Sequence, residues 1–383
     1  MRKVWIYSLL LMAGMVLSQV LPGVLGDACR YYRETSRFTS MVLLGFIMIR
    51  VGMEFEIRKD RLGSYGWDYA VAMTAAAFPW IFCALYFIGF LDPGGSFLSW
   101  ESWKNALLGA RFAAPTSAGI LFSMLAAAGL AGTWVYRKAR VLAIFDDLDT
   151  VLLMIPLKML IVGFKPQLVV VLFVSAFLLL LAWYRFHSVR LRASWNWILL
   201  YALLIASAAE VVHWVSLLVD EVAPVHFEVL LPAFVLGCMI VHPSARERDG
   251  KAEERAATLV SGAFMVLVGL SLPFLFGRNE TEAAMPWAWV AVHVAVVTLL
   301  SNLGKMFPLL CYRKEAAIRE RLALCVGMFP RGEVGAGVLM VSMSYGLGRA
   351  QYTVAILSLA LNLVLTGVFI TAVRALIAAP ART

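Results

Sequence analysis

The chain has 383 residues, of which 62% are hydrophobic and only 15% are charged, and its mean hydropathy is +0.82. A soluble domain carries roughly 25% charged and 45–50% apolar residues, so this composition excludes an ordinary soluble protein and places the chain in lipid. The net charge of +9 would indicate nucleic-acid binding in a soluble protein. In a membrane chain, the basic residues must first be assigned to the two sides of the bilayer.

The sequence lacks the motifs that would indicate a metal site, a disulfide framework or an ATP-driven pump. The five cysteines are scattered, with no CxxC motif and no Cys/His pair, so they predict neither a metal site nor a disulfide framework. The chain also lacks a phosphate-binding GxxxxGKS/T loop, which argues against an ATP-driven pump. We therefore expect no cofactor and no enzymatic activity, and any transport to be secondary.

Twelve apolar stretches are candidates for membrane spans, which need about 20 residues each. In chain order they are 4–25, 38–57, 68–90, 102–129, 136–161, 166–184, 195–219, 225–242, 257–276, 286–310, 320–347 and 351–377. No loop between them is long enough to form a soluble domain. For the first stretch, which begins after Arg2 and Lys3 and ends at LPGVLGDA, a signal peptide is the alternative.

The distribution of Lys and Arg predicts the orientation of the spans. With the N-terminus inside, the cytoplasmic segments hold 21 of the 33 Lys and Arg residues and the outer segments hold seven. Short loops rich in these residues stay in the cytoplasm, so both termini are predicted to be cytoplasmic. The basic composition therefore reflects membrane topology, and we expect contact with lipid and none with nucleic acid.

Besides the charges assigned to the loops and to the ends of the spans, ten charged residues fall inside the predicted spans. Each costs about 2.5–3.5 kcal/mol at the bilayer centre on insertion scales, so we expect them to face one another or a water-filled cavity. The basic ones are Arg50, Arg111, Lys158, Lys305 and Arg331, and the acidic ones are Asp146, Asp147, Asp149, Glu210 and Glu333.

Three aspartates cluster in the fifth span, in the sequence IFDDLDTVLLMIP. On a helix, Asp146 and Asp149 share one face and Asp147 lies about 100° further round. Adjacent carboxylates without a basic neighbour repel, so at least one resists ionisation or needs a cation. Carboxylate oxygens suit hard cations, which predicts a site where Na⁺ and H⁺ compete. The simpler alternative is a cap on the cytoplasmic end of the span, since Arg140 is only six residues before Asp146.

Lys305 lies deep in the tenth span, in the sequence SNLGKMFP. Alone, it is compatible with a side chain that snorkels toward the cytoplasmic face. Opposite a pair of carboxylates, it becomes their expected partner.

The fourth and eleventh spans both carry helix-breaking residues. Pro115 and Gly119 surround Thr116 and Ser117 in RFAAPTSAGILF, and Pro330 precedes three glycines in MFPRGEVGAGVL. Unwound backbone survives at membrane depth only where it is buried or lines a cavity. Matching interruptions in two halves indicate a transporter site built from inverted repeats, whereas either segment alone is compatible with an ordinary kink.

These patterns predict one all-α polytopic membrane transporter domain of about twelve transmembrane helices. We expect a first inverted five-helix repeat at 1–165, connecting helices at 166–222 and a second repeat at 223–383.

Together the motifs resemble the monovalent cation/proton antiporter superfamily, and most closely its bacterial two-aspartate sodium/proton antiporters. The aspartate pair and PRGEVG carry the resemblance most specifically, while PTSAG, the tenth-span lysine, LLGFIMIRVGMEFEIRK and LPAFVLGCMI add weaker support. The resemblance covers nearly the whole chain. It implies the sodium/proton antiporter fold with crossed broken helices, and a homodimer whose core domains move against a dimerisation domain in an elevator-like step.

The resemblance also implies roles for the residues at the matching positions. Asp147 matches the aspartate that binds Na⁺ or a proton, and Asp146 matches the neighbour that pairs with the tenth-span lysine, here Lys305. Thr116 and Ser117 match the unwound crossover beside the site.

Further charges support or depart from the family pattern. Glu333 matches the acidic residue of the eleventh-span motif, with Arg331 as its charge partner. Arg50, Arg111, Lys158 and Asp149 are unusual at their positions, so they retune the choice of ion or mark a divergent member.

The sequence thus predicts a secondary sodium/proton antiporter of the bacterial inner membrane, with a role in pH homeostasis. Alternating access would expose one site to each side in turn, and because a lysine shares the site, exchange is expected to be electrogenic. The partners expected are H⁺ and Na⁺, or Li⁺ or K⁺ in its place.

The alternatives are a K⁺/proton exchanger or K⁺ efflux protein, an organic-anion/Na⁺ symporter, an intramembrane aspartyl protease and a non-transporting member. The Asp pair and Lys305 argue against the symporter, and the absence of a GxGD segment argues against the protease.

Overall fold

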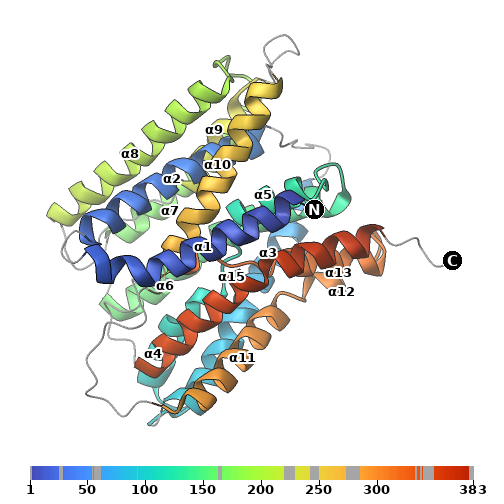
Figure 1. Cartoon of the computed structure of the whole chain (residues 1–383). Helices are drawn as coiled ribbons and strands as arrows, with labels where there is room; N and C mark the ends of the chain where they lie inside the picture. The colour runs from blue at the N-terminus through green and yellow to red at the C-terminus, as the bar shows by residue number, and fades with distance from the viewer. Residues whose placement is uncertain are drawn as a thin grey trace. The chain divides into compact units, whose positions relative to one another are not determined.

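The computed structural model describes residues 2–25, 29–53, 55, 62–92, 94–162, 166–219, 229–241, 250–272, 285–332, 334–336, 339 and 349–378. The regular secondary structure within these ranges is helical, and their only bridge is an isolated parallel one between Val189 and Ile240. The helices (Figure 1) are α1 (Arg2–Leu25), α2 (Cys29–Met53), α3 (Leu62–Tyr86), α4 (Trp100–Ala110), α5 (Ala118–Ala127), α6 (Trp134–Val162), α7 (Pro166–Tyr184), α8 (Trp195–Val219), α9 (Leu230–Met239), α10 (Gly250–Leu270), α11 (Trp287–Gly304), α12 (Pro308–Cys311), α13 (Ile318–Gly327) and α15 (Arg349–Ala378). Two short turns, η3 (Phe87–Leu91) and η4 (Arg111–Ala113), extend α3 and α4.

Each of the twelve predicted apolar stretches corresponds to one or more of these helices. Seven helical segments in the described ranges are long and apolar enough to cross a membrane, and α9 is a shorter apolar helix. The first stretch forms α1, which packs against α5 and α15, and Gly367 of α15 lies directly against Ser8. This packing favours a span of the folded protein over a signal peptide.

The helices form two compact units. The first comprises Met1–Arg30, Arg61–Thr150 and Val268–Thr383, and the second comprises Tyr31–Asp60 and Val151–Leu267. The chain passes from one unit to the other four times, within α2, between residues 60 and 61, within α6 and within α10. The predicted division into inverted repeats at 1–165 and 223–383 stays a prediction.

In the second unit, α9 packs against α7 and α8. Gly52 of α2 and Gly237 of α9 lie backbone to backbone, an approach that a side chain at either position would block. Two charges of the predicted spans find partners here. Glu210 pairs with Arg37 at 2.7 Å, and Arg50 donates to the carbonyl of Glu253 at 3.2 Å.

In the first unit, α3 packs against α4 and α11, and α15 packs against α1, α11 and α13. The contact between α3 and α11 is closest at Gly304, where a Cβ atom would overlap the backbone of Pro79. Gly304 is the last residue of α11 and immediately precedes Lys305, so this close contact lies next to the lysine.

Replacing Gly304 with Ala is expected to separate α11 from α3, because the backbone of Pro79 cannot move aside as a flexible side chain would. Overpacking of this kind typically costs about 1–3 kcal/mol, so the melting temperature of the purified protein should fall. Gly63→Ala is the matched control, since a Cβ there meets no atom within 4 Å. Equal melting temperatures for the two variants would contradict the close contact.

Candidate ion-binding site

The first broken helix of the predicted site is interrupted at its proline. Helix α4 ends at Ala110, η4 continues to Ala113, and α5 begins only at Ala118. Ser117 caps α5 from an extended conformation, and its side chain accepts a hydrogen bond from the Ile120 amide at 3.4 Å. The residues from Ala113 to Ser117 are buried, so this unwound stretch lies inside the first unit.

The second broken helix is interrupted in the same way. Helix α13 ends at Gly327, residues 329–332 are not helical, and helical structure resumes at 334–336. Proline at position 330 removes a backbone donor there. Gly332 lies against Ser117 Oγ and Ile120, where a Cβ atom would come within 3.1 Å of the hydroxyl and 2.8 Å of the isoleucine.

The two unwound segments are hydrogen-bonded to each other. The Ser117 amide donates to the Pro330 carbonyl at 3.0 Å, and the Thr116 hydroxyl donates to the Met328 carbonyl at 3.0 Å. Backbone groups that the broken helices leave unpaired therefore bond across the crossing point, as burial requires.

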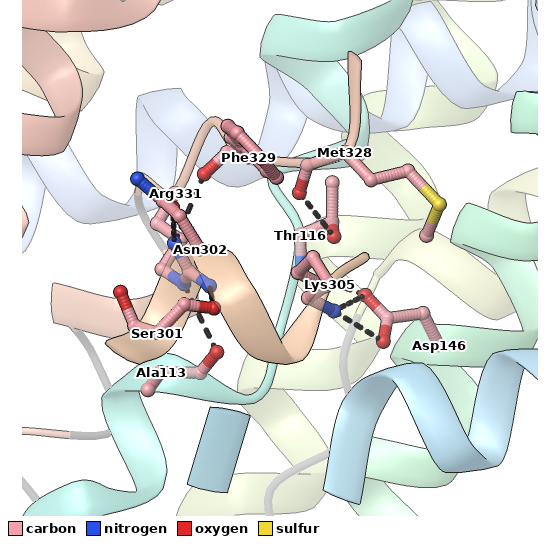
Figure 2. Close-up of polar contacts among 9 residues, drawn as sticks. All are labelled: Ala113, Thr116, Asp146, Ser301, Asn302, Lys305, Met328, Phe329 and Arg331. Atoms are coloured by element: carbon pink, nitrogen blue, oxygen red, sulfur yellow. Dashed lines mark hydrogen bonds and ion pairs between the residues drawn. The ribbon is translucent and has the colours of Figure 1, made fainter. Parts of the chain in front are cut away.

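Asp146 of α6 and Lys305, which follows α11, form an ion pair beside this crossing (Figure 2). Lys305 Nζ lies 2.7 Å from Asp146 Oδ1 and 2.9 Å from Oδ2. The Thr116 amide donates to Oδ2 at 2.8 Å, which ties the carboxylate to the first unwound segment. Both charged side chains are completely buried. The pair therefore has little bulk water to replace a lost partner.

Arg331, in the second unwound segment, is also completely buried and binds carbonyl groups (Figure 2). Its Nε donates to Ala113 O at 2.9 Å and its Nη2 to Ser301 O at 2.7 Å. Its Nη1 donates to Asn302 Oδ1 at 2.8 Å and to Phe329 O at 3.1 Å. Ala113 and Ser301 lie at or near the C-terminal ends of η4 and α11, where helix carbonyls carry partial negative charge. The guanidinium thus satisfies and neutralises two helix ends.

Sequence reasoning did not identify Ser301 and Asn302 as part of this arrangement. They stand next to each other in the apolar tenth span, four and three residues before Lys305. Polar residues so close to a charge inside a span were the available signal. The expected charge partner of Arg331, Glu333, lies outside the described residues.

Asp149 is a third acidic residue on the same part of α6. It is 1% exposed, it shares a hydrogen bond with Tyr69 of α3, and its Oδ2 has no hydrogen-bond partner among the described residues. Asp146 and Lys305 both act on it electrostatically. A buried carboxylate oxygen that accepts no hydrogen bond is energetically costly. Oδ2 of Asp149 is such an oxygen, and it is an acceptor available beside the ion pair.

Of the remaining predicted residues, Thr116 and Ser117 lie at the crossing, as described above. Arg111 is buried at the start of η4. Asp147 belongs to α6, but its side chain lies outside the described residues, as does that of Lys158. The described residues contain no cluster of His, Cys, Asp and Glu able to hold a resident metal ion.

Comparison with known proteins decides the family. The family model described as sodium/hydrogen exchanger, transmembrane, matches residues 3–375. The chain belongs to this exchanger family. The sodium proton antiporter MjNhaP1 from Methanocaldococcus jannaschii at pH 8 has a similar structure, with a TM-score of 0.57, 15% sequence identity, and coverage of 95% of this chain and 89% of that one. No curated protein sequence matches the chain.

Membership in the exchanger family confirms the predicted superfamily and, with the structural likeness, the sodium/proton antiporter fold. The protein is a multi-pass membrane protein of a transporter family. Two unwound helices that cross beside a buried ion pair give this exchanger a polar centre.

Proposed function

We propose that this exchanger is a secondary active sodium/proton antiporter that moves both ions through one site at Asp146 and Asp147. The single observation that carries the proposal is the buried Asp146–Lys305 pair beside the crossing of the broken helices. A buried ion pair adds little stability compared with apolar packing. Its presence in an exchanger therefore supports a role in transport.

In the proposed cycle, Na⁺ from the cytoplasm binds Asp147 with help from Asp146 and from oxygens of the unwound segment around Thr116 and Ser117. The bound cation takes the place of protons and of the Lys305 ammonium. The loaded core then exposes the site to the other side, Na⁺ leaves, protons rebind and the Asp146–Lys305 pair forms again. These groups titrate as a coupled set.

An electrogenic stoichiometry is proposed from the same pair. In the first position of the pair the chain has Asp146, whose carboxylate is bonded to the Lys305 ammonium. The Lys305 ammonium carries a proton in addition to any held by the aspartates. Loss of this proton when Na⁺ binds would allow more than one proton to be exchanged for each Na⁺. Asp149, Arg331 and Glu333 are proposed to support the charge balance of the site.

Assembly and location follow from the family resemblance. We propose a homodimer in the bacterial inner membrane, with both termini in the cytoplasm and a role in pH homeostasis. K⁺/proton exchange or K⁺ efflux is the alternative, since the carboxylates suit any hard monovalent cation.

The test is cation-driven proton movement in proteoliposomes, followed by a pH-sensitive dye with Na⁺, Li⁺ and K⁺ in turn. We expect wild-type protein to respond to Na⁺ and Asp147→Ala to lose the response, because the cation loses its main carboxylate. Glu101→Ala is the control, since that carboxylate is largely exposed and pairs only with Lys104 among the described residues. Silence of folded wild-type protein with every cation would contradict the proposal, and a response to K⁺ alone would establish the alternative.

A further inference from the structure

The first unit holds a second buried charge cluster that the proposed cycle does not use. Lys138 Nζ of α6 lies 3.0 Å from Asp68 Oδ1 and 3.2 Å from Oδ2. It also lies 2.9 Å from Glu315 Oε2. Asp68 is 2% exposed and Lys138 is 9% exposed, whereas the Glu315 side chain is 41% exposed. The inner part of the cluster is therefore shielded from water.

Tyr312 completes this cluster. Its hydroxyl donates to Asp68 Oδ1 at 2.7 Å, and its ring lies under Lys138 Nζ, 4.4 Å from the ring centroid. Trp134 of α6 packs edge-on against the same ring. Because Tyr312 directly follows α12, the cluster joins three elements, namely α3, α6 and the chain after α12.

These elements are the ones that position the ion pair. On α6, Lys138 precedes Asp146 by eight residues, which is about 12 Å along a helix. After α11, Tyr312 follows Lys305 by seven residues. Helix α6 and the stretch from Lys305 to Tyr312 are therefore joined twice, once at the ion pair and once at the cluster.

Neither membrane topology nor a gain in stability explains why the charges of this cluster are buried. The excess of Lys and Arg on the cytoplasmic side does not require a buried side chain. Arg137, the residue before Lys138, is exposed. Burying a lysine and an aspartate gains little over apolar side chains of similar size. What such a pair does supply is a defined geometry, because it holds only when every partner is in place.

We propose that Asp68, Lys138 and Tyr312 form a clasp that holds the Lys305 segment against α6 and so positions Lys305 on Asp146. The proposal rests on the antiport function only for its kinetic consequence. When a cation displaces Lys305, the clasp keeps the ammonium close to Asp146. The pair then competes strongly with the cation and re-forms quickly after the cation leaves.

Loss of the clasp therefore has a directional effect on transport. A weaker Asp146–Lys305 pair is displaced at lower cation concentration, so the concentration for half-maximal transport, KM, falls by about twofold to tenfold, the range expected for the net contribution of one typical hydrogen bond. Maximal turnover falls as well, because the pair re-forms more slowly. A variant that is merely less well folded would lower turnover at unchanged KM.

Two variants of full-length protein test the clasp. Lys138→Met removes the charge and keeps the volume, and Tyr312→Phe removes only the hydroxyl and keeps the ring. Hydrogen–deuterium exchange of the peptide covering residues 305–316 is measured in both, together with KM for Na⁺ in proteoliposomes. We expect faster exchange in this peptide and a lower KM, with the larger change in Lys138→Met. Arg137→Met is the matched control and should leave both unchanged.

The exchange measurement needs no transport, so failure of the clasp and failure of antiport can be told apart. Unchanged exchange of residues 305–316 in Lys138→Met overturns the clasp, whatever the transport assay gives. Faster exchange with an unchanged or higher KM overturns its role in positioning Lys305. If wild-type protein moves no ions, the antiport proposal fails, and the exchange result alone decides whether the clasp holds the segment.

Discussion

Asp146→Asn is expected to abolish Na⁺-driven proton movement and to lower the melting temperature of the purified protein sharply. The side-chain amide oxygen introduced at position 146 still accepts the hydrogen bond from the Thr116 backbone N–H. Lys305, however, is left as a completely buried cation without its carboxylate partner. Removing one member of a buried pair typically costs about 3–5 kcal/mol. Melting in detergent and antiport in proteoliposomes are measured on the same preparation.

A second substitution in this variant separates stability from transport. Adding Lys305→Met to Asp146→Asn removes the orphaned charge, so most of the lost melting temperature should return while transport stays absent. This dissociation is the expected signature of a pair kept for function. An Asp146→Asn variant that melts like wild type, or a double variant that transports, would contradict the role assigned to the pair.

Arg331→Lys is expected to destabilise the crossing of the two unwound segments almost as much as Arg331→Met does. The guanidinium donates to four acceptors on three segments of the chain. A lysine has a single compact ammonium group. It lacks the planar array of N–H donors with which the guanidinium bonds all four acceptors at once. The buried carbonyls of Ala113 and Ser301 would lose their donor, at about 1–3 kcal/mol for each unsatisfied group. Melting temperature and the yield of folded protein report the loss.

Asn302→Ala provides the graded comparison, because it removes one of the four acceptors and leaves the three backbone carbonyls bonded. Its melting temperature should lie between those of wild type and Arg331→Lys. Wild-type stability of Arg331→Lys would show that charge alone suffices at this position, and that the geometry of the four bonds is unimportant.

The sequence by itself determined the class of the protein and the residues of its candidate site. Apolar length and the cost of charge in lipid are local properties, so the predicted spans and the ten unusual charges could be located without a structure. Pro115 and Pro330 each stand beside glycines that tolerate unwound backbone, and this combination located both interruptions, whereas Pro79 lies inside the continuous helix α3. Opposite charges buried in different spans need partners, so Asp146 and Lys305 could be matched across a separation of 159 residues.

Beyond that pair, the tertiary structure alone decided which groups meet. Among the described residues Arg331 bonds the Asn302 amide and three carbonyls, none of which its own motif indicated, and its expected partner Glu333 lies outside them. Lys138 counted as one of many cytoplasmic basic residues, yet it is 9% exposed between two carboxylates and a tyrosine ring. Tyr69 gave no signal at all, although it binds Asp149. Such contacts depend on how helices rotate and cross, which hydropathy and charge do not encode, because any of several neighbours could have satisfied the same buried group.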